Sequence, residues 1–70
     1  MQIILNGEEK DLLLSTKTIT ITDLFNHLDL TPTGRFVELN SSIIHPEHFS
    51  KTEIHENDVI EIIQFMGGGA

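Results

Sequence analysis

The segment VIEIIQFM, residues 59–66, decides the fold, because it is the longest stretch of the chain that is rich in β-branched and aromatic residues. Such residues favour strands, so we predict that this segment is the longest strand of the protein. The turn residues END, residues 56–58, precede it. The block GGGA, residues 67–70, follows it.

A β-hairpin is predicted at the start of the chain. Two short apolar runs, residues 2–5 and 10–14, are separated by a segment that begins with Asn6 and Gly7. Asn-Gly between two such runs is the strongest local hairpin signal, because both residues tolerate the positive φ of tight hairpin turns.

A single helix is predicted over residues 20–29. Thr20, followed three residues later by Asp23, resembles a capping box, although residues 18–22 also alternate like a strand. Proline and glycine within residues 31–34 end the helix. Four apolar residues recur at the spacing of one helix face: Ile21, Leu24, Phe25 and Leu28.

The remaining elements are short. We predict strands at residues 36–39 and 43–44, a turn at 40–42, and a polar segment over 46–52 that holds one helical turn. The expected fold class is therefore α+β, with one helix packed across one face of a mixed sheet of four or five strands. The first and last strands are expected side by side in the middle of this sheet.

The composition excludes several classes of protein. The chain has 70 residues, a formal charge of −7 and no cysteine. The negative charge repels nucleic acids and anionic membranes, and the lack of thiols removes disulfides and thiolate chemistry. No apolar run approaches the ~20 residues of a membrane span, and no signal peptide pattern is present. We therefore expect a cytoplasmic protein.

The sequence contains no convincing catalytic or metal-binding motif. The only glycine cluster has no helix after it, which argues against a phosphate loop, and the serines lack a nucleophile context. His45, Glu47 and His48 could supply metal ligands, but Pro46 breaks the helical spacing that would align the two rings. We therefore expect exposed loop histidines, no metal site and no enzymatic activity.

The glycine-rich segment at the end of the chain differs from the rest because it has almost no side chains. The domain is expected to occupy residues 1–66, and residues 67–70 form a thin, flexible extension that reaches ~13 Å when extended. Such a tail can deliver its carboxyl end into the active site of another protein. The alternative is a frayed terminus, the usual fate of terminal glycines.

A docking surface beside the tail follows from strand alternation. If Ile60 and Ile62 face the helix, then Ile63 and Phe65 point to the open face of the sheet, where Ile4 joins them from the neighbouring strand. Three apolar residues beside such a tail suggest a docking patch. The opposite phase, or packing at the sheet edge, is the alternative.

The chain resembles the ThiS family, the small sulfur carrier proteins of thiamin biosynthesis, over nearly its whole length. Molybdopterin-synthase small subunits and ubiquitin are more distant relatives, and the resemblance implies their β-grasp fold. The segments that carry the resemblance are followed by the glycine ending, and they are MQIILNG (1–7), ITDLF (21–25), FVELN (36–40), IHPE (44–47) and NDVIEIIQF (57–65).

The resemblance implies a protein substrate rather than an enzyme. A ThiF-like adenylyltransferase uses Mg-ATP to convert the carboxylate of the terminal glycine into an acyl-adenylate. A sulfur donor such as a cysteine desulfurase system then gives a thiocarboxylate, and thiazole synthase receives the sulfur. By position, Gly69 is the terminal glycine, preceded by Gly68 and by Gly67 in the partner-binding region. No stably bound cofactor is implied, and the free carrier is expected to be a monomer.

Ala70 departs from the family pattern, whose mature form ends in Gly-Gly. Either a protease removes Ala70, or Ala70 is not native, or the carrier role is lost; we expect one of the first two. Three other functions remain open at this point. They are a molybdopterin-synthase-type carrier, a ubiquitin-like modifier that conjugates to lysines, and an interaction module that does not need its tail.

Overall fold

The structure is a computed structural model that describes residues 1–14, 16 and 18–65. Within these residues a short 3-10 helix, η1 (Pro46–His48), and one α-helix, α1 (Ile21–His27), interrupt a series of strands. The strands are β1 (Gln2–Leu5), β2 (Glu8–Asp11), β3 (Thr18–Thr20), β4 (Arg35–Leu39), β5 (Ser42–Ile44), β6 (Glu53–His55) and β7 (Val59–Gln64).

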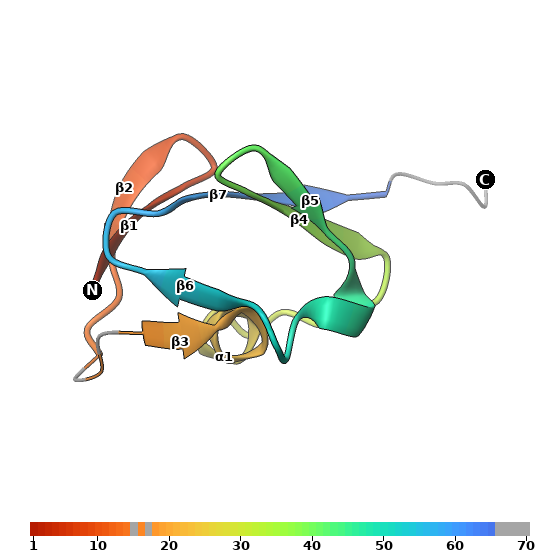
Figure 1. The fold of residues 1–70 in the computed structure, drawn as a ribbon, viewed down its shortest axis with the longest axis horizontal. Coiled ribbons are helices and arrows are strands. Elements are labelled where there is room, and N and C mark those ends of the chain that lie inside the picture. Colours follow the sequence, from red (N-terminus) through yellow and green to blue (C-terminus); the bar gives the residue numbers. More distant parts are fainter. Residues whose placement is uncertain (15, 17, 66–70) are drawn as a thin grey trace.

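Five of the strands form the main sheet, in the order β2-β1-β7-β4-β5 (Figure 1). The first and last strands of the described chain, β1 and β7, are parallel neighbours in its middle, and the other pairs are antiparallel. The expectation of a mixed sheet with β1 beside β7 is therefore confirmed. The longest strand is β7, as predicted, although it ends at Gln64 rather than at residue 66.

The hairpin turn also forms where the sequence predicts it. Asn6 and Gly7 have φ values of 51° and 85°, which suits a two-residue turn that matches strand twist. Such a turn pairs Leu5 with Glu8 directly, so the second strand covers residues 8–11 rather than the apolar run 10–14. The register set by the turn thus overrides the hydrophobic pattern.

The threonine-rich segment 18–22, whose strand-like alternation competes with the helix prediction, contains the end of a strand and the start of the helix. Strand β3 ends at Thr20, whose hydroxyl accepts a hydrogen bond from the Asp23 N–H at 3.1 Å, while the Asp23 carboxylate accepts one from the Thr20 N–H at 3.0 Å. This capping box confirms the prediction. The helix ends at His27, two residues early, because Asp29 adopts a left-handed φ of 60° and the Leu30 N–H returns to the Phe25 carbonyl.

A second, two-stranded sheet pairs β3 with β6, which the sequence analysis does not anticipate. Strand β6 has a single apolar residue, Ile54, between Glu53 and His55, and so lacks an alternating run. In Figure 1 the β3–β6 pair and α1 lie on the same side of the main sheet. The core between these layers contains Ile3, Leu12, Ile19, Ile21, Leu24, Phe25, Val37, Phe49, Ile54 and Ile60.

The ends of β1 and β7 do not coincide. The pairing of β1 with β7 ends at Leu5 and Ile60, whereas β7 continues to Gln64 with β4 as its partner. Alternation along this extension directs Ile62 toward the core side, and Ile63 is not among the residues packed on the core. The last part of β7, just before the glycine block in the sequence, therefore has one face toward the core side and one toward the open side of the sheet.

Candidate functional site

Phe65 is the last described residue before the glycine block, and it is anchored to the sheet. Its N–H donates a hydrogen bond of 2.8 Å to the carbonyl oxygen of Gly34, which extends the pairing of β7 with β4 beyond Gln64. Gly34 has a φ of 75°, a conformation that favours glycine. The predicted site residues Gly67, Gly68, Gly69 and Ala70 lie outside the described residues.

An apolar cluster lies on the open face beside this anchor. Ile63 pairs with Phe36 across the two strands, and the rings of Phe36 and Phe65 are tilted by 45° with centroids 5.0 Å apart. The ring of His45 lies 6.4 Å from that of Phe36. Phe65 remains 62% exposed. We call Phe36, Ile63 and Phe65 the root cluster.

The predicted phase of β7 is confirmed, but the predicted patch is divided. Ile60 is fully buried and Ile62 packs on the core, so Ile63 and Phe65 belong to the open face. Ile4 is on this face too, but its partner in β7 is Val59. Val59 precedes Ile63 by four residues, or ~13 Å along the strand, so Ile4 does not join Ile63 and Phe65.

The residue that takes the place expected of Ile4 is Phe36. The sequence predicts a strand at this residue but does not show that the strand is a neighbour of residues 59–66. Without that assignment the cross-strand partner of Ile63 stays unknown. The sequence signal that could have found Phe36 is alternation within its strand, because Val37 and Leu39 share one face and Phe36 lies on the other.

Carboxylates occupy the open face between the root cluster and Ile4. Glu38 and Glu61 are direct cross-strand partners, an arrangement that is unfavourable for like charges. Within the described strands of the main sheet, the two basic residues pair with positions on the other face, Lys10 with Ile3 and Arg35 with Gln64. The open face therefore combines apolar and acidic groups.

The histidines have the exposed positions that the sequence predicts. His27, His45, His48 and His55 are all exposed, and His48 lies 3.7 Å from the carboxylate of Glu47. Among the residues that the structure describes, no group of three or more histidine, aspartate or glutamate side chains is arranged to hold a metal ion. No helix in the described part of the chain is long and apolar enough to cross a membrane.

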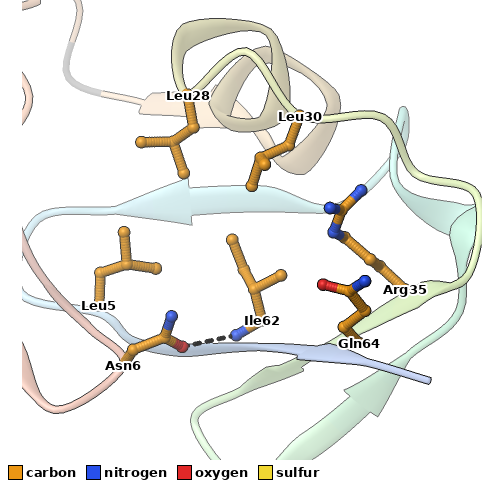
Figure 2. Close-up of a pocket in the computed structure, with 7 residues that line it drawn as sticks. All are labelled: Leu5, Asn6, Leu28, Leu30, Arg35, Ile62 and Gln64. Atoms are coloured by element: carbon orange, nitrogen blue, oxygen red, sulfur yellow. Dashed lines mark hydrogen bonds between the residues drawn. The ribbon is translucent and has the colours of Figure 1, made fainter. Parts of the chain in front are cut away.

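The opposite face of β7 borders a pocket of about 360 Å³ that sequence analysis does not predict (Figure 2). Figure 2 shows Leu28 and Leu30, in the segment that follows α1, pointing toward Leu5 and Ile62 on the sheet. Asn6, Arg35 and Gln64 complete the lining. The signals for it are scattered among four segments of the chain, so no local pattern marks it.

Two polar side chains of this pocket make defined contacts. The Asn6 side-chain oxygen accepts a hydrogen bond of 2.9 Å from the Ile62 N–H, so it takes the place of the β1 backbone just beyond the last pair. The Arg35 guanidinium donates to the Thr31 carbonyl oxygen at 2.6 Å. Arg35 is thereby held at the rim of the pocket.

Comparison with known proteins gives matches along the whole chain. Residues 3–69 match the model of the ThiS family. A sulfur carrier protein ThiS from Bacillus subtilis is 42% identical over 65 residues, which cover 93% of this chain and 96% of that protein. A thiazole synthase from Paramagnetospirillum magneticum is 29% identical over 70 residues, which cover all of this chain and 21% of that protein.

A solved structure agrees with the fold. The crystal structure of the thiamine biosynthesis protein ThiS from Geobacter metallireducens matches with a TM-score of 0.85 and 28% identity, covering 99% of this chain and 100% of that one. The predicted ubiquitin-like β-grasp fold, with one helix across a mixed sheet, is thereby confirmed.

Proposed function

The chain belongs to the ThiS family, and from this premise we propose that it is a sulfur carrier protein of thiamin biosynthesis and a substrate of partner enzymes. The carboxylate of Gly69, exposed after removal of Ala70, attacks ATP in a ThiF-like adenylyltransferase, forming an acyl-adenylate and releasing pyrophosphate. Sulfide, or the terminal sulfur of a persulfide on a donor such as a cysteine desulfurase system, then displaces AMP. In the persulfide case, a thiol cleaves the acyl disulfide that forms and leaves as a disulfide with the donor. The product is a thiocarboxylate on Gly69.

The observation that carries this proposal is the extent of the family match, which runs from residue 3 through Gly69. A protein whose function did not involve the glycine block would not need similarity that extends into it. The chain contains no cysteine, so the sulfur sits on the backbone carboxyl end. The Mg-ATP belongs to the adenylating partner, because a carboxylate reacts only when AMP provides a leaving group.

The root cluster is the proposed docking site for the adenylating enzyme. Phe65 and Ile63 are adjacent to the glycine block, and the exposed ring of Phe65 offers the kind of aromatic anchor that dominates many interfaces. Glu38 and Glu61 beside it favour a basic partner surface, which raises the association rate. Ile4, four residues further down the strand pair, contributes at the periphery of this contact.

Thiazole synthase is the proposed sulfur acceptor. The match of this entire chain to 21% of a thiazole synthase supports this choice, because domains that act together are often joined in one polypeptide. Gly67 and Gly68 are proposed to pass through the narrow entrance of the acceptor site, since glycine lacks a side chain that would be excluded.

Mass spectrometry after incubation with a ThiF-like enzyme, ATP and a sulfide donor tests the proposal. The chain truncated after Gly69 should gain the mass of one oxygen replaced by sulfur, and the chain that retains Ala70 should not. A chain truncated after Gly68 is the matched control. Higher-mass conjugates would favour a protein modifier, and no mass change in the Gly69 form would contradict the carrier function.

A further inference from the structure

The last part of β7 has a free backbone edge on the side where β1 has ended. The backbone N–H and carbonyl groups of successive β7 residues point alternately toward β4 and toward β1. The Phe65 N–H, which donates to the Gly34 carbonyl, points to the β4 side. The N–H and carbonyl of Ile62, and those of Gln64, therefore point to the β1 side. Asn6 satisfies the Ile62 N–H, but no described residue pairs with Gln64 on this side, because the β1 ladder ends at Ile60.

The pocket in Figure 2 lies directly along this edge. Its walls are four half-buried apolar side chains: Leu5, Leu28, Leu30 and Ile62. Both Ile62 and Gln64 contribute to the lining, so a strand laid against the edge would place alternate side chains over the pocket. A free edge next to an apolar pocket is the arrangement that binds extended peptides by strand addition.

The charge at this pocket is the opposite of that of the chain as a whole. Arg35 is the only ionisable residue of the lining, and no carboxylate lines the pocket, although the chain carries −7. Arg35 pairs with Gln64, two residues beyond Ile62 on the same face. Arg35 lies on β4, across β7 from the free edge, so a carboxylate opposite Gln64 on an added strand would reach the Arg35 guanidinium across the Gln64 side chain.

We propose that this edge binds an extended segment of a partner protein as an added strand. The Ile62 carbonyl and the Gln64 N–H pair with its main chain, an apolar side chain enters the pocket, and a carboxylate two residues away pairs with Arg35. This site is separate from the root cluster, and its peptide binding does not depend on the chemistry of Gly69.

A second copy of this chain does not provide such a segment through its own free edge. The side chains of β7 that face the helix side are Ile60, Ile62 and Gln64, and none of them is acidic. Two chains of charge −7 also repel each other. The occupant is thus a different protein with an apolar and an acidic residue at alternate strand positions.

Titration of the ¹⁵N-labelled protein with two synthetic peptides tests the proposal by NMR. The probes are the N-acetylated, C-amidated peptide TVLVDVT and the same peptide with lysine in place of its aspartate. The aspartate peptide should shift the amide signals of Leu5, Leu30, Ile62 and Gln64. It should bind roughly two- to fivefold more tightly than the lysine peptide, the range of an exposed ion pair, and R35E should reverse this preference.

Two variants of Gln64 separate strand addition from simple pocket filling. Q64P removes the N–H that points to the free edge, a place where a strand tolerates proline, together with the Gln64 side chain, and should bind about tenfold more weakly than Q64A. Q64A removes the same side chain but keeps the N–H, so the loss of binding that Q64P shows beyond Q64A measures the main-chain hydrogen bond. The R35E reversal provides an independent test if Q64P does not fold.

Four results would overturn the proposal. They are equal binding by folded Q64P and Q64A, peptide-induced shifts confined to the root cluster, the absence of shifts at millimolar peptide, and concentration-dependent shifts at Gln64 without peptide. The last result would identify a second copy as the occupant. None of these results bears on sulfur transfer, which is measured on the tail.

Discussion

The two faces of β7 near its end differ in a way that follows from one helix covering one side of the sheet. On the open face, Ile63 and Phe65 lie beside the paired carboxylates Glu38 and Glu61. On the helix side, Ile62 and Gln64 border a pocket whose charged group is Arg35. The end of β7 and the following Phe65 thus offer two apolar surfaces whose neighbouring charged groups have opposite sign, and both surfaces are close in sequence to the glycine block.

The contrast depends on where neighbouring elements end. Helix α1 stops at His27, and β1 stops at Leu5, so neither covers the last residues of β7 on the helix side. On the open face no element of the described chain covers the sheet, and the root cluster remains accessible. The shortness of the helix and of β1 therefore creates the second surface.

Replacing Ile60 by alanine should have the largest effect on the free energy of unfolding, because it removes core packing on which both faces of β7 depend. Ile60 is fully buried where β1 and β7 meet, and such truncations cost roughly 2–5 kcal/mol. Urea unfolding measures the loss. Val59→Ala, at a half-exposed neighbouring position, should cost about 0.5 kcal/mol or less; equal losses would contradict the assignment of the two faces.

Replacing Phe65 by aspartate should break the open face alone. The charge adds to the carboxylates there and removes an exposed aromatic anchor, so adenylation should fall by the equivalent of about 2 kcal/mol or more, while the fold persists. Pyrophosphate release with the ThiF-like enzyme measures this rate. Leu13→Asp, at a position 86% exposed in another part of the chain, is the control. Unchanged adenylation of Phe65→Asp would remove the root cluster from the interface.

Replacing Asn6 by glycine should weaken the helix side alone. Glycine keeps the positive φ of the turn but removes the oxygen that accepts the Ile62 N–H, at a cost of about 1 kcal/mol. Hydrogen exchange should show faster exchange at Ile62. Asn6→Asp retains an acceptor and should protect this amide, and unchanged exchange in Asn6→Gly would show that the contact contributes nothing.

Replacing Glu61 by glutamine should have the smallest effect, a stabilisation of roughly 0.2–1 kcal/mol. It relieves the repulsion with Glu38, and urea unfolding should detect the gain. The same change at Glu8, in the N-terminal hairpin, is the control.

Raised salt should slow adenylation of the wild type, because salt screens the attraction between the carboxylates and a basic partner surface. An adenylation rate that does not depend on salt would show that Glu38 and Glu61 do not contribute to docking.

The elements that sequence reasoning predicts are those with local causes. The Asn6–Gly7 turn, the Thr20 capping box and the apolar alternation of β7 each depend on residues a few positions apart. Strand β6 is not predicted, because a single apolar residue, Ile54, gives no alternating pattern. Its pairing with β3 depends on tertiary contacts. Local signals therefore give the elements and their order, but not every partner.

The site is predicted less completely because it depends on register. Alternation places Ile4, Ile63 and Phe65 on one face, but the register puts Ile4 beside Val59 and brings Phe36 to Ile63. The pocket around Arg35 depends on the ends of three elements, which local patterns fix poorly. The proposed role of Gly69 remains a prediction, as do the cytoplasmic location and the roles of Ala70 and the partners.

Intact mass spectrometry of the protein isolated from its own cells tests the central claim most directly. The account predicts a species that ends at Gly69, part of which carries sulfur in place of one carboxyl oxygen. A population that ends only at Ala70, with no truncated or sulfur-containing species, would contradict it.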